Sequence, residues 1–114
     1  MAYLVNHLIE KGFTVNITDP QASERNFQME MEFQGYFLRG RDNYQYFGSN
    51  HLKAAAGASA IVVGTEWDEY QTLDYEDIRK IMKPDQALFF DLRSYLNVEK
   101  IQKAGFDKVF KLGN

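Results

Sequence analysis

The fold is decided by the stretch Ala60-Ile61-Val62-Val63-Gly64-Thr65-Glu66-Trp67-Asp68-Glu69-Tyr70, an apolar run that breaks abruptly into an acidic loop holding the only tryptophan. An unbroken apolar run of this kind is typical of a parallel strand that is covered on both faces. Ligands of open α/β sheets collect just beyond the carboxyl ends of such strands. The stretch therefore predicts a parallel α/β sheet with the acidic loop at the edge of a candidate site.

Outward from this stretch, helix, turn and strand alternate along the chain. Asp74 and Asn97 are placed to cap helices, Gly12 and Gly105 to end them, and Asp19-Pro20 to end a strand. The predicted helices are 4–9, 50–56, 75–82 and 98–104, and the predicted strands are 13–17, 44–47, 60–63, 87–91 and 106–112. Such alternation implies a mainly parallel sheet with helices on both faces, a three-layer Rossmann-like α/β fold.

Residues 21–48 support two interpretations. Phe27, Met29, Met31 and Phe33 alternate strictly with polar residues, which favours a strand, whereas Ser23 ahead of Glu24 favours the start of a short helix. Both interpretations stay open at this point. Residues 39–43 are expected to form a turn or loop before the short aromatic strand.

Composition narrows the functional classes. A chain of 114 residues is expected to form one compact domain without room for separate cofactor and substrate domains. The formal charge of −3, from 13 basic and 16 acidic residues, disfavours a nucleic-acid binder. The absence of cysteine fits a reducing compartment, so the cytoplasm is the expected location. No apolar run approaches the roughly 20 residues that span a bilayer, so neither a membrane nor a nucleic acid is an expected partner.

Among the charged residues, Arg93 has the strongest case for binding a ligand. The predicted strand ends at Asp91, and Arg93 follows it at the sheet edge that also holds the acidic loop. A guanidinium there would hold a diphosphate or carboxylate with two hydrogen bonds, and Asp91 would fix its orientation. The alternative is a purely structural Asp–Arg pair at the end of a strand.

The acidic loop also has two interpretations. Glu66, Asp68 and Glu69 would suit acid and base catalysis if their pKa values were pushed apart, but no base–nucleophile pair accompanies them. The alternative is a solvated loop held down by Trp67 and Tyr70. Three carboxylates would repel a phosphate, so the loop is expected to form a wall of the site and no catalytic residue is assigned.

Other cofactor motifs are missing from the sequence. It contains no dinucleotide fingerprint with three spaced glycines, so no bound cofactor is expected for this chain alone. His7 and His51 belong to different predicted helices and form no paired ligand motif, so no metal is expected.

These residues together resemble the C-terminal UDP-binding domain of the UDP-glucose 6-dehydrogenase family. The resemblance covers nearly the whole chain except residues 26–47, and its most specific part is the Thr-Glu-Trp-Asp-Glu string. The matching strings are Gly57-Ala58-Ser59-Ala60-Ile61-Val62-Val63-Gly64-Thr65-Glu66-Trp67-Asp68-Glu69-Tyr70, Leu73-Asp74-Tyr75, Phe90-Asp91-Leu92-Arg93, Gly105-Phe106, Leu8-Ile9-Glu10-Lys11-Gly12-Phe13 and Asp19-Pro20.

The resemblance implies a function for part of an enzyme. The family oxidises UDP-glucose to UDP-glucuronate with NAD, which an N-terminal Rossmann domain binds, and uses a cysteine nucleophile and a lysine. This chain has no cysteine, which excludes that route from it, so we expect it to be inactive alone, with NAD bound elsewhere in the parent enzyme. The arginine of the family's Phe-Asp-Gly-Arg motif, which contacts UDP-sugar, falls on Arg93, although Leu92 replaces the glycine. The resemblance marks Thr65, Glu66 and Trp67 as a characteristic loop and possible wall of the crevice.

The family's domain opens with a central strand that precedes the first helix of this chain. Residues 1–114 are therefore expected to be a single UDP-sugar-binding-like domain, truncated at its N-terminus and lacking the family's first strand. The strands at Phe13 and Ile61 must then pair directly or leave a gap that invites another chain. The expected partners are UDP or UDP-glucose and either a second copy or the missing N-terminal part. The alternative function is a non-enzymatic oligomerisation module without nucleotide binding.

Overall fold

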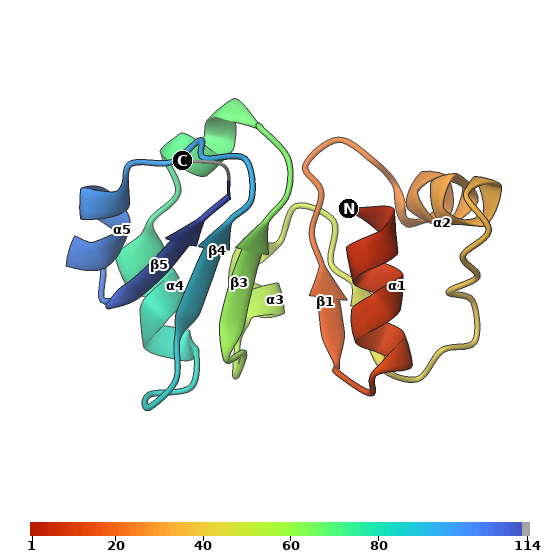
Figure 1. Ribbon diagram of the computed structural model, residues 1–114, viewed down its shortest axis with the longest axis horizontal. Coiled ribbons are helices and arrows are strands. Elements are labelled where there is room, and N and C mark those ends of the chain that lie inside the picture. The colour runs from red at the N-terminus through yellow and green to blue at the C-terminus, as the bar shows by residue number, and fades with distance from the viewer. Residues whose placement is uncertain (113–114) are drawn as a thin grey trace. The chain divides into compact units, whose positions relative to one another are not determined.

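The computed structural model describes residues 1–112 of the 114. It confirms the predicted α/β class, with parallel strands in two small sheets that are flanked by helices (Figure 1). The chain divides into two compact units, Met1–Ala54 and Ala55–Asn114, and each is described by itself.

The first unit is built on one parallel strand pair. Its elements are α1 (Ala2–Glu10), β1 (Val15–Ile17), α2 (Glu24–Phe33) and β2 (Tyr44–Tyr46), and α3 (His51–Ala55) reaches the boundary with the second unit. β1 and β2 run parallel, with Val15 opposite Tyr44 and Ile17 opposite Tyr46. The buried core of this unit joins both helices to the sheet through Val5, Ile9, Met31, Leu38 and Tyr44.

The helical interpretation of residues 24–33 is confirmed. Ser23 is the N-cap of α2, and its hydroxyl accepts a hydrogen bond from the Asn26 backbone N–H at 3.1 Å. In a helix the alternating apolar residues split between two faces, since Met31 is buried while Phe33 is exposed. The strand that the same alternation favoured is therefore wrong.

The second unit carries the apolar run Ala60–Val63 and the acidic loop that follows it. Its elements in order are β3 (Ala60–Val63), the 3₁₀ helix η1 (Asp68–Gln71), α4 (Tyr75–Ile81), β4 (Leu88–Asp91), α5 (Val98–Lys103) and β5 (Lys108–Lys111). The strands form a parallel sheet in the order β3-β4-β5. Asp74 and Asn97 cap α4 and α5 as predicted.

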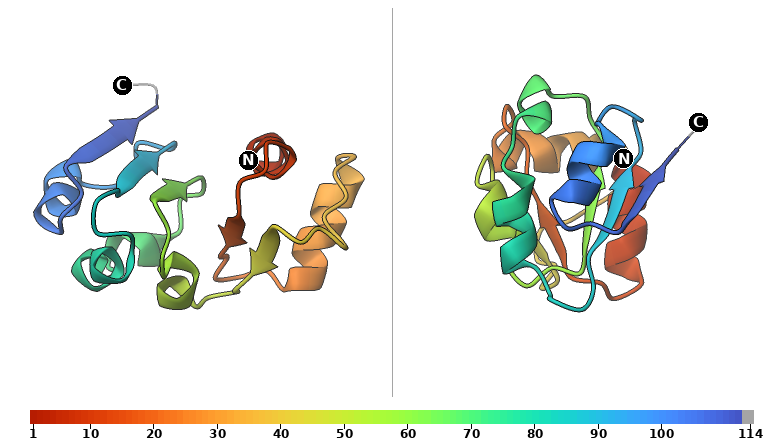
Figure 2. Two further views of the ribbon diagram at one scale, coloured as in Figure 1. Left: turned by 90° about the horizontal axis from the view of Figure 1, so that it is seen from below. Right: turned by 90° about the vertical axis from the view of Figure 1, so that its left-hand side faces the viewer.

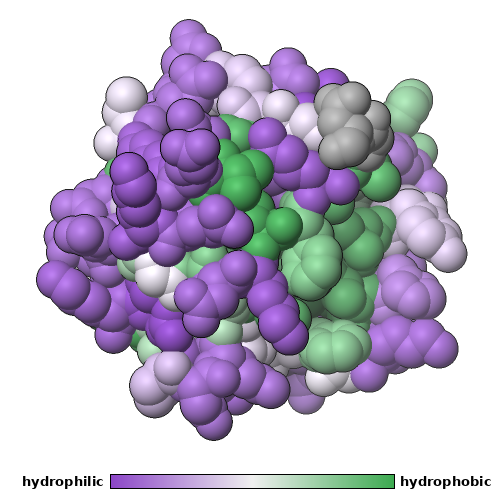
Figure 3. Space-filling view, turned by 60° about the vertical axis from the view of Figure 1, so that its left-hand side comes forward, coloured by the Kyte–Doolittle hydropathy of each residue, from purple (hydrophilic) through white to green (hydrophobic). Residues whose placement is uncertain are grey.

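The helices of this unit lie on one face of the three-stranded sheet. α4 and α5 pack on the face that carries Phe89, and the left view of Figure 2 shows both helices on the same side of the strands. Side chains alternate between the faces of a strand, so the other face carries Val62, Leu88, Phe90 and Phe110. Phe110 is 47% exposed. In Figure 3, hydrophobic residues, drawn in green, are also visible together on the surface of the molecule.

Four strands, β1, β2, β3 and β5, each keep one unpaired edge among residues 1–112. β1 pairs with β2 and β3 pairs with β4, in separate sheets, so the direct pairing considered for the strands at Phe13 and Ile61 is not formed. The described strands form two separate sheets, so of the two alternatives direct pairing is wrong.

The described helices are short. The longest in residues 1–112 is α2, with 10 residues, and none there combines the length and apolarity needed to cross a membrane.

Candidate functional site

The site lies where β3 and β4 end. The two strands are parallel neighbours, with Val63 opposite Asp91, so the segments that follow them leave the sheet at the same edge. This register brings the acidic loop after Val63 beside the turn that holds Arg93, as the sequence predicted.

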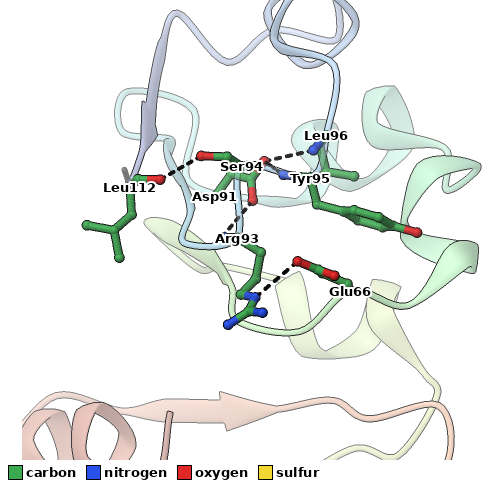
Figure 4. A network of polar contacts seen from close by, with 7 residues as sticks. All are labelled: Glu66, Asp91, Arg93, Ser94, Tyr95, Leu96 and Leu112. Carbon is green, nitrogen blue, oxygen red and sulfur yellow. Dashed lines mark hydrogen bonds and ion pairs between the residues drawn. The ribbon is translucent and has the colours of Figure 1, made fainter. Parts of the chain in front are cut away.

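Asp91 is the centre of the turn at residues 91–96. Its side chain is fully buried, and its Oδ1 accepts the backbone N–H of Arg93 at 3.2 Å (Figure 4). Its Oδ2 accepts the backbone N–H groups of Tyr95 and Leu96, each at 2.8 Å. Because a buried carboxylate needs such partners, these bonds both satisfy Asp91 and fix the path of the turn.

The guanidinium of Arg93 points to the acidic loop and away from Asp91. Its Nε donates to Oε1 of Glu66 at 3.3 Å, and about half of each side chain is exposed (Figure 4). Asp91 therefore holds Arg93 through its main chain, and the ion-pair partner is Glu66. Asp91 was predicted either to orient the guanidinium of Arg93 or to form a structural ion pair with it. In the structure Asp91 binds the Arg93 backbone N–H, and the guanidinium pairs with Glu66.

Leu92 does not need the freedom of a glycine. Among residues 1–112, Ser94 is the one non-glycine residue with a positive φ, 51°, so the left-handed position of the turn comes after Arg93. The Ser94 hydroxyl donates to the backbone carbonyl of Leu112 at 2.6 Å, which ties the turn to the end of β5.

The acidic loop is anchored to the core by its aromatic residues, and its first residues are exposed to solvent. Tyr70 is buried and Trp67 packs against the core of the second unit, while Thr65 and Glu66 are exposed. The Trp67 Nε1 is buried without a hydrogen-bond partner in the described part of the chain. This is the solvated loop held down by Trp67 and Tyr70 that the sequence offered as the alternative to a catalytic cluster.

Tyr95 is a member of the site that the sequence analysis missed. Its hydroxyl donates to Asp68 Oδ1 at 2.7 Å, which joins the turn to the acidic loop a second time. This hydrogen bond and the charge of the same carboxylate raise the pKa of Tyr95 above its ordinary value. A tyrosine four residues beyond a strand end gives no distinctive signal in a sequence.

A cavity lies beside the turn at residues 91–96. This cavity, of about 320 Å³, is lined by residues of η1, α4, the turn and α5, among them Tyr75, Tyr95 and Lys100. The Lys100 Nζ donates to the Gln71 carbonyl at 2.5 Å, so this lysine is engaged with the main chain. Within residues 1–112 no three histidine, aspartate or glutamate side chains converge as a metal ion requires.

A parallel α/β sheet that presents an arginine just beyond the carboxyl ends of its strands has the layout of a nucleotide-binding or other anion-binding domain. The family model described as the UDP binding domain of the UDP-glucose/GDP-mannose dehydrogenase family matches residues 1–98. The chain belongs to this family, which confirms the resemblance seen in its sequence.

Individual relatives agree with this assignment. The chain is 29% identical to a UDP-glucose 6-dehydrogenase of Rickettsia bellii over 90% of its own length and 21% of the relative. It is 31% identical to UDP-glucose 6-dehydrogenase 4 of Arabidopsis thaliana, over 81% and 21% of the two chains. It is also 30% identical to the UDP-glucose 6-dehydrogenase of Mus musculus, over 91% and 22%. The chain thus spans about a fifth of the length of these relatives.

Proposed function

We propose that this domain binds the UDP part of a UDP-sugar, with Arg93 as the residue that contacts the diphosphate. The observation that carries the proposal is the place of Arg93, at the strand-end edge of a chain that belongs to a family with a UDP binding domain. Half of its side chain is exposed, so an anion reaches the guanidinium from solvent. UDP-glucose is the proposed ligand, because the relatives from Rickettsia bellii and Mus musculus are named UDP-glucose 6-dehydrogenases.

The structure suggests how the turn serves this role. A guanidinium that donates two parallel hydrogen bonds to a phosphate loses less conformational freedom on binding when its backbone is already held in place. The three N–H bonds to Asp91 provide that rigidity, so Asp91 is a positioning residue in this proposal. Thr65, Glu66 and Trp67 form the adjoining wall.

The oxidation itself is assigned to other residues. We propose that the domain acts within an NAD-dependent UDP-glucose 6-dehydrogenase that forms UDP-glucuronate, and that it is not catalytic alone. NAD supplies the hydride acceptor in such a reaction, and this sequence offers neither a dinucleotide fingerprint nor a cysteine. The absence of cysteine also fits the cytoplasmic location that we propose.

We further propose that the domain works beside other protein, either a second copy or the remainder of the enzyme. The unpaired edges of β1 and β3 support this, because free edges offer hydrogen-bonding groups to another strand. The exposed face with Val62, Leu88 and Phe110 also supports it, since parallel sheets are usually covered on both faces.

Calorimetric titration with UDP and UDP-glucose tests the proposed binding. We expect a Kd of about 1 mM or tighter for the natural chain and loss of detectable binding in Arg93→Ala. Arg39→Ala is the matched control, because Arg39 is another exposed arginine with a glutamate partner, Glu32, at 3.1 Å. The proposal fails if the natural chain gives no binding heat, or if both variants weaken binding equally.

A further inference from the structure

Glu66 forms an ion pair with the Arg93 guanidinium, the group that is proposed to bind the ligand. Its carboxylate accepts from Arg93 Nε at 3.3 Å, and Figure 4 shows the two side chains meeting between the loop after β3 and the turn after β4. Glu66 and Arg93 are 27 positions apart in the sequence, so their contact depends on the fold. Glu66 is the ion-pair partner found for this guanidinium in the described chain.

A carboxylate and a phosphate are rival acceptors for one guanidinium. If a phosphate of the ligand approaches Arg93 while Glu66 stays in place, two negative charges lie close together. Glu66 engages Nε, so a phosphate that approaches the Nη donors meets a repelling carboxylate and binds more strongly when Glu66 turns away. Both side chains are about half exposed, so solvent is free to take over the Glu66 carboxylate when it leaves.

We propose that Glu66 competes with the ligand for Arg93 and thereby sets which anions the site accepts. This inference rests on the proposed function. A ligand with a single carboxylate offers Arg93 no more than Glu66 does, and Glu66 has the advantage of being already attached nearby. The site therefore selects ligands that bring two or more negative charges, such as a nucleoside diphosphate.

The test compares two amide variants of the same loop. Glu66→Gln keeps the shape of the side chain and removes the competing charge. Asp68→Asn removes one negative charge two positions away, where the carboxylate contacts the Tyr95 hydroxyl and not Arg93. Both positions are exposed, so neither change is expected to unfold the chain. UDP is titrated into the natural chain and both variants at low salt, where exposed charges are least screened.

We expect Glu66→Gln to bind UDP about 3- to 10-fold more tightly than the natural chain, a range set by the modest strength of exposed ion pairs. Asp68→Asn is expected to stay within about 2-fold. Equal gains in both variants would mean that only net charge matters, and would overturn the inference. Binding in the natural chain with no gain in Glu66→Gln would overturn it while leaving the proposed function standing. Absence of UDP binding in all three proteins would overturn the proposed function as well.

Discussion

Replacing Asp91 with asparagine is the sharpest test of how the turn is held together. The substitution keeps the size of the side chain but removes its charge and exchanges one acceptor oxygen for an NH₂ donor. In the structure both oxygens accept backbone N–H groups, one from Arg93 and two from Tyr95 and Leu96. Whichever way the amide turns, at least one N–H group faces a donor and loses its partner.

The expected cost follows from these bonds. Hydrogen bonds to a charged group contribute about 1.5–3 kcal/mol each, and a buried N–H without a partner costs about 1–3 kcal/mol. Asp91 is fully buried, so water cannot replace the lost bonds. We therefore expect Asp91→Asn to lower the free energy of unfolding of the second unit by about 2–4 kcal/mol, a large share of the roughly 5–15 kcal/mol typical of a whole domain.

Trp67 makes the measurement specific. It is the only tryptophan and packs against the core of the second unit, so its fluorescence during urea unfolding reports on that unit. The midpoint of the transition should fall by about 1 M urea or more. Asp85→Asn, an exposed aspartate ahead of β4, is the control and should change stability by less than about 0.5 kcal/mol. A loss below about 1 kcal/mol in Asp91→Asn would refute the view that this carboxylate organises the turn.

Two further predictions concern other parts of the chain. Gly105→Ala should destabilise the second unit by about 1–3 kcal/mol in the same urea assay, because Gly105 has φ +116° and a Cβ there would lie 2.9 Å from Cγ of Arg79; a stability equal to the natural chain would contradict this. In the first unit, burial and the nearby Glu24 charge raise the pKa of Tyr44 to about 12. The unfolded tyrosine loses its proton near its ordinary pKa of 10.0 and the folded one does not, so stability should be full below that pH and fall between the two values. Circular dichroism should show this alkaline loss in the natural chain and a smaller one in Tyr44→Phe, and an identical loss in both would count against it.

Local signals explain why most element boundaries could be predicted. Asp74 and Asn97 each accept a backbone N–H three residues ahead, Asp77 at 3.1 Å and Lys100 at 3.2 Å. Such a cap needs only a short polar side chain at the right position, so a sequence displays it directly.

The segment before β2 was ambiguous for a physical reason. When apolar residues alternate strictly, every second one of them lies four positions after the last. Phe27 and Met31 are spaced in this way and thus share one face of a helix. Periodicity alone could not separate the two structures. The Ser23 cap was the decisive signal, because it satisfies backbone donors that a strand would not leave free.

For the candidate site, the sequence predicted that Arg93 and the acidic loop share one sheet edge, but not the contacts between them. Arg93 was predicted because it follows an apolar strand. Its pairing with Glu66 depends on two strands lying side by side in register, which one sequence does not reveal. The role of Asp91 had an available signal, since aspartate at the start of a turn commonly accepts the N–H two residues ahead, as it does here from Arg93.

The order of the strands in each sheet allows the strands to pair in the order in which they are synthesised. Each parallel pair joins strands that are consecutive in the sequence, β1 with β2, then β3 with β4 and β4 with β5. During synthesis from the N-terminus, the pairing of β1 with β2, including the hydrogen bond from the Phe47 N–H to the Ile17 carbonyl, therefore does not wait for β3, and the second sheet grows by adding each new strand to the one made just before. Among the strands of residues 1–112, none has to enter between two that have already paired, so their backbone pairing can follow the order in which they leave the ribosome.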